Sequence, residues 1–194
     1  MSVTKMGLWA HEKLNATRKL EAIGPLALRV YLFFPLWMAG TNKWSSFDST
    51  VAWFGNDDWG LGLPAPILLA FLATWTEIVG AIFLLLGFAT RYVAVPLMVT
   101  MLVAILTVHW GNGWSAIADG AADAGVAERT EAARVILQEH GHYTWLTAKG
   151  NFVILNNGIE FGVTYLIMLL SLFFTGAGKI VSLDYWISKY YKTS

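Results

Sequence analysis

Glu77 is a carboxylate in the middle of an apolar run, which is an unusual position for a side chain that can carry charge. The run from Pro64 to Phe88 is long enough to cross a bilayer as a helix, and Glu77 lies near its midpoint. A carboxylate at this depth is costly unless it is protonated, paired or used in function. We expect a protonated Glu77 that is hydrogen-bonded to a hydroxyl on another helix, either Tyr165 or Thr100. This arrangement could be a proton or ligand site or a polar fastener between helices, and the sequence favours neither.

A second group of polar residues lies at the predicted ends of the apolar runs. Lys43 and His109 close two of these runs, and Glu160 opens another. A tight bundle would allow a Lys43–Glu160 ion pair, and His109 with Glu160 would give an imidazole–carboxylate pair for a proton or a metal ion. Ordinary interfacial capping of a helix by Asn156 or Asn157 is the favoured alternative. We assign no metal site, because His109 is the one histidine within an apolar run.

The aromatic content bears on the cofactor. The chain has 10 tryptophans, and most of them flank the apolar runs. An interfacial aromatic belt explains this pattern without a ligand, whereas stacking of a quinone head group is the alternative. Haem is disfavoured, because bis-histidine ligation needs histidines on facing helices and His109 stands alone at membrane depth. The cofactor is therefore unknown, with a quinone retained as a candidate.

Composition places these residues in a membrane protein. Hydrophobic residues make up 56% of the 194 and charged residues 13%, against about a quarter charged in soluble domains. Residues 1–194 are therefore predicted to form a single membrane domain. A net charge of zero argues against nucleic acid as a partner. The absence of cysteine excludes disulfides and thiolate metal sites.

The predicted fold is an all-α integral membrane protein, a four-transmembrane-helix bundle. The spans are expected at residues 25–42, 64–88, 92–110 and 158–176. The segment between the first two spans is assigned to an outer loop. A longer outer loop, residues 111–157, is predicted to contain a short surface helix over 126–140 that ends at Gly141.

Lysine and arginine set the orientation. They concentrate in both terminal segments and in the hinge at Arg91, so the positive-inside rule places both termini in the cytoplasm and residues 111–157 outside. Amphipathic stretches over 8–23 and 180–191 are predicted to lie along the inner interface. Arg29 lies only about 5 Å inside the first span at 1.5 Å per residue, and we expect its side chain to snorkel toward the cytoplasm. A buried ion pair is the less favoured alternative for Arg29.

One helix face carries small residues next to Glu77. Glu77, Gly80, Leu84 and Gly87 follow each other at spacings of 3, 4 and 3, which allows another helix to approach closely. Together with Arg29, Gly40-Thr-Asn-Lys43, Glu160 and Ser182-Leu-Asp184, this face resembles the DoxX family of small four-helix bacterial membrane proteins. The resemblance covers most of the chain, from Arg29 to Asp184. The long outer loop departs from the simplest members.

Three further stretches resemble a subgroup of that family found beside copper-binding ribosomal-peptide maturation proteins. They are HWGNGW (109–114), VILNNGIEFGVTYLIML (153–169) and SLDYWI (182–187). This resemblance implies an accessory role in copper or oxidative-stress-linked peptide maturation at the bacterial inner membrane. Its partners would be the bilayer and a maturation protein or peptide bound at the outer face.

The family resemblance also implies an alternative function, a subunit of a quinone-linked membrane oxidoreductase in which Glu77 relays a proton. Whether the chain is itself an enzyme stays open. A purely structural protein needs only the glycine face, and a homo-oligomer is compatible with every one of these readings.

Overall fold

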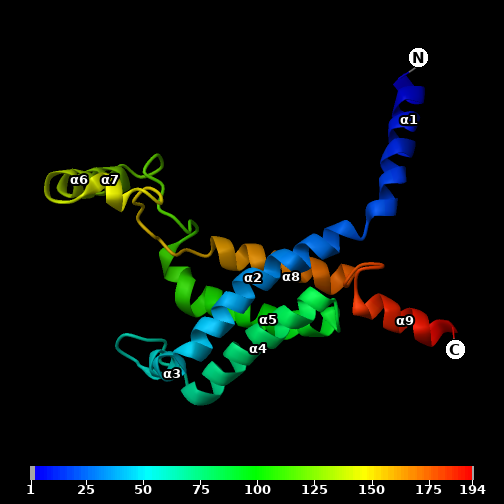
Figure 1. Cartoon of the computed structure of the whole chain (residues 1–194), viewed down its shortest axis with the longest axis horizontal. Coiled ribbons are helices and arrows are strands. Elements are labelled where there is room, and N and C mark those ends of the chain that lie inside the picture. Colours follow the sequence, from blue (N-terminus) through cyan, green and yellow to red (C-terminus); the bar gives the residue numbers. More distant parts are fainter. Residues whose placement is uncertain (1–2, 194) are drawn as a thin grey trace. The chain divides into compact units, whose positions relative to one another are not determined.

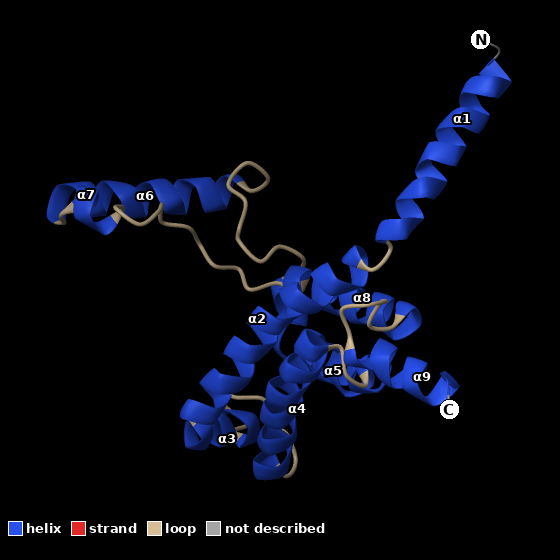
Figure 2. Ribbon diagram, turned by 45° about the vertical axis from the view of Figure 1, so that its right-hand side comes forward, coloured by secondary structure: helices blue, strands red, loops and turns tan. Residues whose placement is uncertain are grey.

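The structure is a computed structural model that describes residues 3–193, without the side chains of residues 3–5, 10, 19 and 193. The described residues form helices joined by loops, with an isolated bridge between Ile117 and Leu155 (Figure 2). In chain order the α-helices are α1 Val3–Ala16, α2 Ile23–Ser45, α3 Phe47–Gly55, α4 Pro66–Leu86, α5 Thr90–Ala104, α6 Ala124–His140, α7 Tyr143–Leu146, α8 Glu160–Thr175 and α9 Leu183–Thr193 (Figure 1). Short 3-10 helices cover Thr17–Leu20 and Trp110–Asn112, and a π-helical turn covers Ile105–His109.

Three of these helices are long and apolar enough to cross a membrane. They are Ile23–Ser45, Pro66–Leu86 and the continuous stretch Thr90–Asn112. They coincide with the first three predicted spans. The fourth predicted span falls on α8, which is apolar but has only 16 residues, or about 24 Å against a hydrocarbon core of about 30 Å. That α8 also crosses the membrane stays a prediction.

The chain divides into two compact units. One contains Met1–Met101 together with Tyr165–Ser194, and the other contains Leu102–Thr164. The core of the first unit is a cluster of buried residues from α2, α4, α5 and α8. The members are Leu32, Leu36, Ala81, Leu84, Leu97, Met101, Leu169 and Leu172. Large apolar side chains on the same helices also point outward, such as Phe34, Ile67 and Phe174, which are 60–69% exposed. A helix bundle that is apolar inside and outside is suited to lipid rather than to water.

Glycine brings α4 and α5 together as the sequence predicts. A Cβ atom on Gly80 would lie 2.8–3.0 Å from the side-chain carbons of Leu97 on α5. Gly87 has a different role: it ends α4 with a left-handed φ of 63°, and its N–H donates to the carbonyl of Leu84. The helix therefore runs over Pro66–Leu86 rather than over the whole predicted range of 64–88.

We expect Gly80→Ala to destabilise the bundle by about 1–3 kcal/mol, because the added methyl group overpacks the contact with Leu97. Gly24→Ala is the matched control, because a Cβ at Gly24 in α2 meets no atom within 4 Å. Thermal unfolding in one detergent should show a lower midpoint for Gly80→Ala and an unchanged or slightly higher one for Gly24→Ala. Equal midpoints for the two variants would contradict close packing at Gly80.

Helix α3 lies in the segment between the first two spans, which was predicted to be a loop. Phe54 and Thr50 are buried, and a Cβ on Gly55 would lie 2.8 Å from Pro66 at the start of α4. The helix has only nine residues, so its short apolar pattern was compatible with a loop, and packing against α4 stabilises it.

In the second unit, the two ends of the long loop lie side by side. Residues 113–118 run along residues 154–160, with Ala118 N–H donating to the Ile154 carbonyl at 3.0 Å and Asn156 N–H donating to the Ala116 carbonyl at 3.0 Å. The predicted surface helix is confirmed as α6, which begins after Asp123 and ends before Gly141. The Asp123 carboxylate accepts the N–H of Gly125 at 2.8 Å, which is N-cap chemistry.

Candidate functional site

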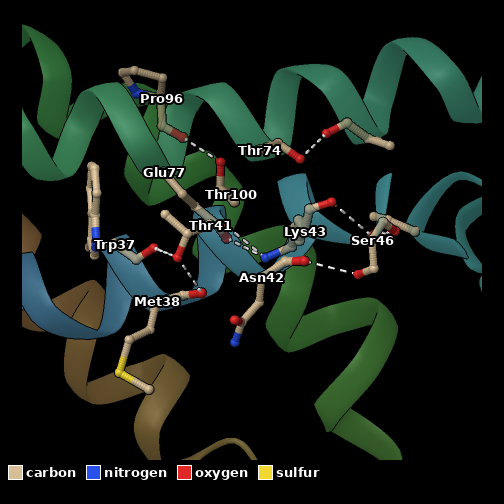
Figure 3. A network of polar contacts seen from close by, with 12 residues as sticks. Trp37, Met38, Thr41, Asn42, Lys43, Ser46, Thr74, Glu77, Pro96 and Thr100 are labelled. Atoms are coloured by element: carbon tan, nitrogen blue, oxygen red, sulfur yellow. Dashed lines mark hydrogen bonds and ion pairs between the residues drawn. The ribbon is translucent and has the colours of Figure 1, made fainter. Parts of the chain in front are cut away.

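An ion pair between Lys43 on α2 and Glu77 on α4 lies inside the first unit (Figure 3). Lys43 Nζ lies 2.7 Å from Oε2 and 2.9 Å from Oε1 of Glu77. The Glu77 side chain is 4% exposed and the Lys43 side chain 25% exposed. An ammonium that contacts both carboxylate oxygens is a charge-assisted interaction in a largely apolar surrounding.

Gly40 explains why α2 and α4 approach each other here. A Cβ on Gly40 would lie 2.6 Å from Cγ1 of Ile78 and 3.1 Å from Cβ of Glu77. Lys43 follows Gly40 by three residues, so both lie on the helix face that packs against α4. The Gly40-Thr-Asn-Lys43 motif thus combines a close helix contact with a cation one turn later.

This pairing corrects two predictions. Glu77 contacts the Lys43 ammonium, whereas the expectation was a hydrogen bond to the hydroxyl of Thr100 or Tyr165. The Thr100 hydroxyl donates to the carbonyl of Pro96 in its own helix at 3.0 Å (Figure 3), and the Tyr165 ring packs beside Tyr31 with a centroid distance of 6.3 Å. The expected Lys43–Glu160 pair is also wrong, because Lys43 contacts Glu77. The long lysine stem lets a cation near the helix end reach a carboxylate deep in the neighbouring helix.

The Lys43 ammonium has more hydrogen-bond donors than its contacts with Glu77 use. An ammonium has three N–H donors, and in the described residues two of them serve Glu77. Thr74 lies one turn before Glu77 on α4, is fully buried, and donates its hydroxyl to the Ala70 carbonyl at 2.7 Å (Figure 3). Thr74 is therefore satisfied within its own helix, and Lys43 keeps one donor for a ligand.

Aromatic side chains flank the segments that carry the ion pair. Trp44, next to Lys43, packs against Trp75 on α4 at a centroid distance of 5.4 Å, and Trp75 packs against Phe71 at 6.1 Å. Phe47 lies 6.0 Å from Trp44 and borders an apolar hollow of about 480 Å³ at the start of α4. The hollow is lined by Phe47, Ala65, Pro66, Ile67, Leu68 and Phe71. This surface could hold a flat apolar group.

Apart from Lys43, the polar residues predicted at the ends of the apolar runs lie in the second unit and stabilise the fold of its loop. They are His109, Asn156, Asn157 and Glu160. His109 Nδ1 lies 2.8 Å from the Asn157 carbonyl, which can only accept, so Nδ1 carries the proton. The Glu160 carboxylate accepts the N–H of Ala116 at 2.9 Å, so the expected His109–Glu160 pair is not formed. The Asn156 amide donates to the carbonyls of residues 112 and 115 at 2.6 and 2.8 Å.

The capping prediction for Asn156 and Asn157 is therefore wrong. Asn156 uses its side chain on loop carbonyls, and Asn157 has a left-handed φ of 57°. Helix α8 begins only at Glu160, beyond both residues. Among the residues that the structure describes, no group of three or more His, Cys, Asp or Glu side chains could hold a metal ion.

Arg29 corrects the snorkelling prediction. Its side chain is fully buried, and its guanidinium donates to three carbonyls: Leu84 at 3.3 Å, Leu85 at 3.4 Å and Val181 at 2.6 Å. The last carbonyls of a helix have no partner within it, so an arginine from another helix satisfies them. The end of α4 lies within reach of Arg29 on α2. The snorkelling prediction rested on the depth of Arg29 in its own helix and did not consider the free carbonyls at the end of a neighbouring helix.

Asp184 completes this cluster at the end of the bundle, and the sequence assigned it no role. Its carboxylate accepts the N–H groups of Ala89 and Thr90 at 2.7 and 3.0 Å, and its own N–H donates to the Gly87 carbonyl at 2.9 Å. It therefore caps α5 from a position 94 residues further along the chain. Arg91 lies close by and donates from Nε to the Phe173 carbonyl at 2.8 Å.

Residues 24–110, a little under half of the chain, match the DoxX family model. A protein of Bacillus subtilis (strain 168) described as "Putative oxidoreductase CatD" is 33% identical over 86 residues. The aligned region covers 44% of this chain and 60% of that protein. No solved structure gives a significant match. Neither the family description nor the relative's name mentions copper or a peptide.

Proposed function

We propose that this chain belongs to the DoxX family as a whole and acts as a subunit of a quinone-linked membrane oxidoreductase. The observation that carries the proposal is the Lys43–Glu77 ion pair, which holds a carboxylate and an ammonium together within the helix bundle. The matched segment, residues 24–110, contains both residues. The name of the Bacillus subtilis relative, "Putative oxidoreductase CatD", supports the same class of function.

The residues around the ion pair fit a quinone. A quinone carries carbonyl oxygens, which accept hydrogen bonds, and a flat ring and tail that favour apolar surroundings. Lys43 has a donor left for such an oxygen, and Glu77 could hold or release a proton beside it. The rings of Trp44, Trp75 and Phe71 and the adjoining apolar hollow supply a surface for the ring and tail. A bound quinone supplies electron transfer, which no side chain here provides.

The arrangement also supports a bilayer location with both termini on one side. The start of α2, the α4–α5 turn and the segment before α9 contact each other, since Gly178 approaches Pro25 and Asp184 contacts residues 87–90. Lysine and arginine gather in these segments, as expected for the cytoplasmic side of a bacterial inner membrane.

The proposal predicts that quinone co-purifies with the protein. Purification in mild detergent followed by mass spectrometry of extracted lipids should give near-stoichiometric quinone for the native chain and little for Glu77→Gln. Glu160→Gln is the matched control, because a glutamine oxygen can still accept the Ala116 N–H and the residue lies outside the first unit. A native protein without quinone, or equal quinone in both variants, would contradict the proposal.

A second candidate function is the accessory role in copper or oxidative-stress-linked peptide maturation. One observation favours it: α6 and residues 152–154 border a hollow of about 560 Å³ in the outer loop, which could receive a peptide or partner protein. Elemental analysis of the same preparation separates the two candidates. Stoichiometric copper or a bound peptide without quinone would favour the accessory role.

A further inference from the structure

Helix α9 carries an exposed apolar stripe. Leu183, Trp186, Ile187 and Tyr190 follow each other at spacings of 3, 1 and 3, which places them on one helix face. Their side chains are 42–70% exposed. Asp184 and Ser188 lie on other sides of the helix, so α9 is amphipathic.

Cations flank the stripe. Lys189 lies beside it, with Nζ 5.1 Å from the centroid of the Trp186 ring, and Lys192 lies on the polar side. Aromatic residues with a polar tip, a lysine beside the apolar stripe and a lysine on the polar side are typical of helices that lie in the plane of a membrane interface. A groove on a protein partner would not need cations at this border.

The start of α9 is fixed at the end of the apolar bundle. Asp184 bonds to the N–H groups of Ala89 and Thr90 in the turn between two membrane-length helices, and Arg29 holds the Val181 carbonyl. The stripe therefore begins near the point where α4 ends and α5 starts, at one end of two helices that are long and apolar enough to cross a membrane.

Further charges at the same end are mostly positive. Arg91 is exposed at the start of α5, and Lys179 forms an ion pair with Glu21 before α2. The hydrogen bond and charge of Lys179 lower the pKa of the Glu21 carboxyl, and Glu21 in turn raises the pKa of Lys179. Glu21 is thus paired and Asp184 is occupied by backbone N–H groups, and the cations Arg91, Lys189 and Lys192 lie at exposed positions.

We propose that α9 binds the anionic lipid head groups of the membrane that the bundle spans, with Leu183, Trp186, Ile187 and Tyr190 in the interface and Lys189 and Lys192 against the head groups. This inference goes beyond the proposed redox function and does not depend on quinone binding. It also specifies which lipids the predicted interfacial segment binds. Burial of the apolar stripe alone would not distinguish anionic from neutral lipid, whereas contacts between lysines and head groups would.

The absence of native cysteine makes a direct test available. Tyr190→Cys places a single environment-sensitive fluorophore on the stripe, and Ser188→Cys places the same label on another side of α9. The full-length protein is reconstituted in nanodiscs of phosphatidylcholine alone or mixed with phosphatidylglycerol. The label at 190 should shift to the blue when phosphatidylglycerol is present, and the label at 188 should emit as in water in both discs.

Charge reversal supplies the second variant. Lys189→Glu with Lys192→Glu, both on exposed positions, should abolish the shift caused by phosphatidylglycerol at position 190, and high salt should reduce it. Three results would overturn the proposal: identical emission from positions 188 and 190, a blue shift at 190 that is equal in both discs, or protection of 190 only in native membranes. The last result would indicate a protein partner in place of lipid.

Discussion

Lys43→Met is expected to destabilise the bundle by about 3–5 kcal/mol, because it leaves the Glu77 carboxylate buried without its cation. Glu77→Gln should cost less, since the lysine is 25% exposed and can reach solvent or the head-group layer. The double variant Lys43→Met/Glu77→Gln should recover much of the loss seen in Lys43→Met, because it contains no unpaired charge. Thermal unfolding of all three variants in one detergent gives the coupling between the two residues.

The order of the midpoints is the test of this prediction. A double variant that is less stable than Lys43→Met by the full cost of Glu77→Gln would show that the two residues act independently, which contradicts the ion pair. The same variants also separate stability from function. If the double variant is stable but binds no quinone, the pair serves the ligand as well as the fold.

Arg29→Met should be the second large loss, roughly 2–4 kcal/mol, because one buried and two partly buried carbonyls lose a charged donor. Arg91→Met is the matched control, since Arg91 is exposed and one backbone carbonyl accepts its hydrogen bond. In addition to a lower unfolding midpoint, Arg29→Met should release the segment around Val181. Trypsin should therefore cleave after Lys179 faster in Arg29→Met than in the native protein or in Arg91→Met.

The cleavage rate distinguishes a local effect from a global one. Faster cleavage at Lys179 in Arg29→Met at a temperature well below unfolding would support the link between Arg29 and this segment. Equal midpoints and equal cleavage for the two arginine variants would show that burial of Arg29 contributes nothing to the bundle.

Apolar length made the membrane class and three long helices predictable from the sequence, because the bilayer sets a minimum span. Glu77 was also identifiable, since a carboxylate in such a run is uncommon. Its partner was not. The position of a residue along a span predicts the depth of its backbone in the membrane, but not the reach of its side chain. Lys43 contacts Glu77 through a flexible side chain that spans several ångströms.

The roles of Arg29 and Asp184 were beyond prediction for a different reason. Arg29 interacts with backbone carbonyls in the last turn of α4, and Asp184 interacts with backbone N–H groups at the start of α5; both partners lie far from these residues in the sequence. Backbone donors and acceptors have no residue type, so the sequence carries no pattern that marks them as partners. Helix α3 shows the same limit, because its stability comes from packing against α4.

Asp184 also bears on the order in which the chain is completed. The ribosome makes α4 and α5 well before residue 184, so the hairpin enters the membrane with the N–H groups of Ala89 and Thr90 uncapped. The turn acquires its carboxylate only when synthesis has passed α8. Final closure of the bundle is therefore a late event in biogenesis, and ribosome-bound chains that stop before Asp184 should leave this hairpin more open to proteases than chains that extend beyond it.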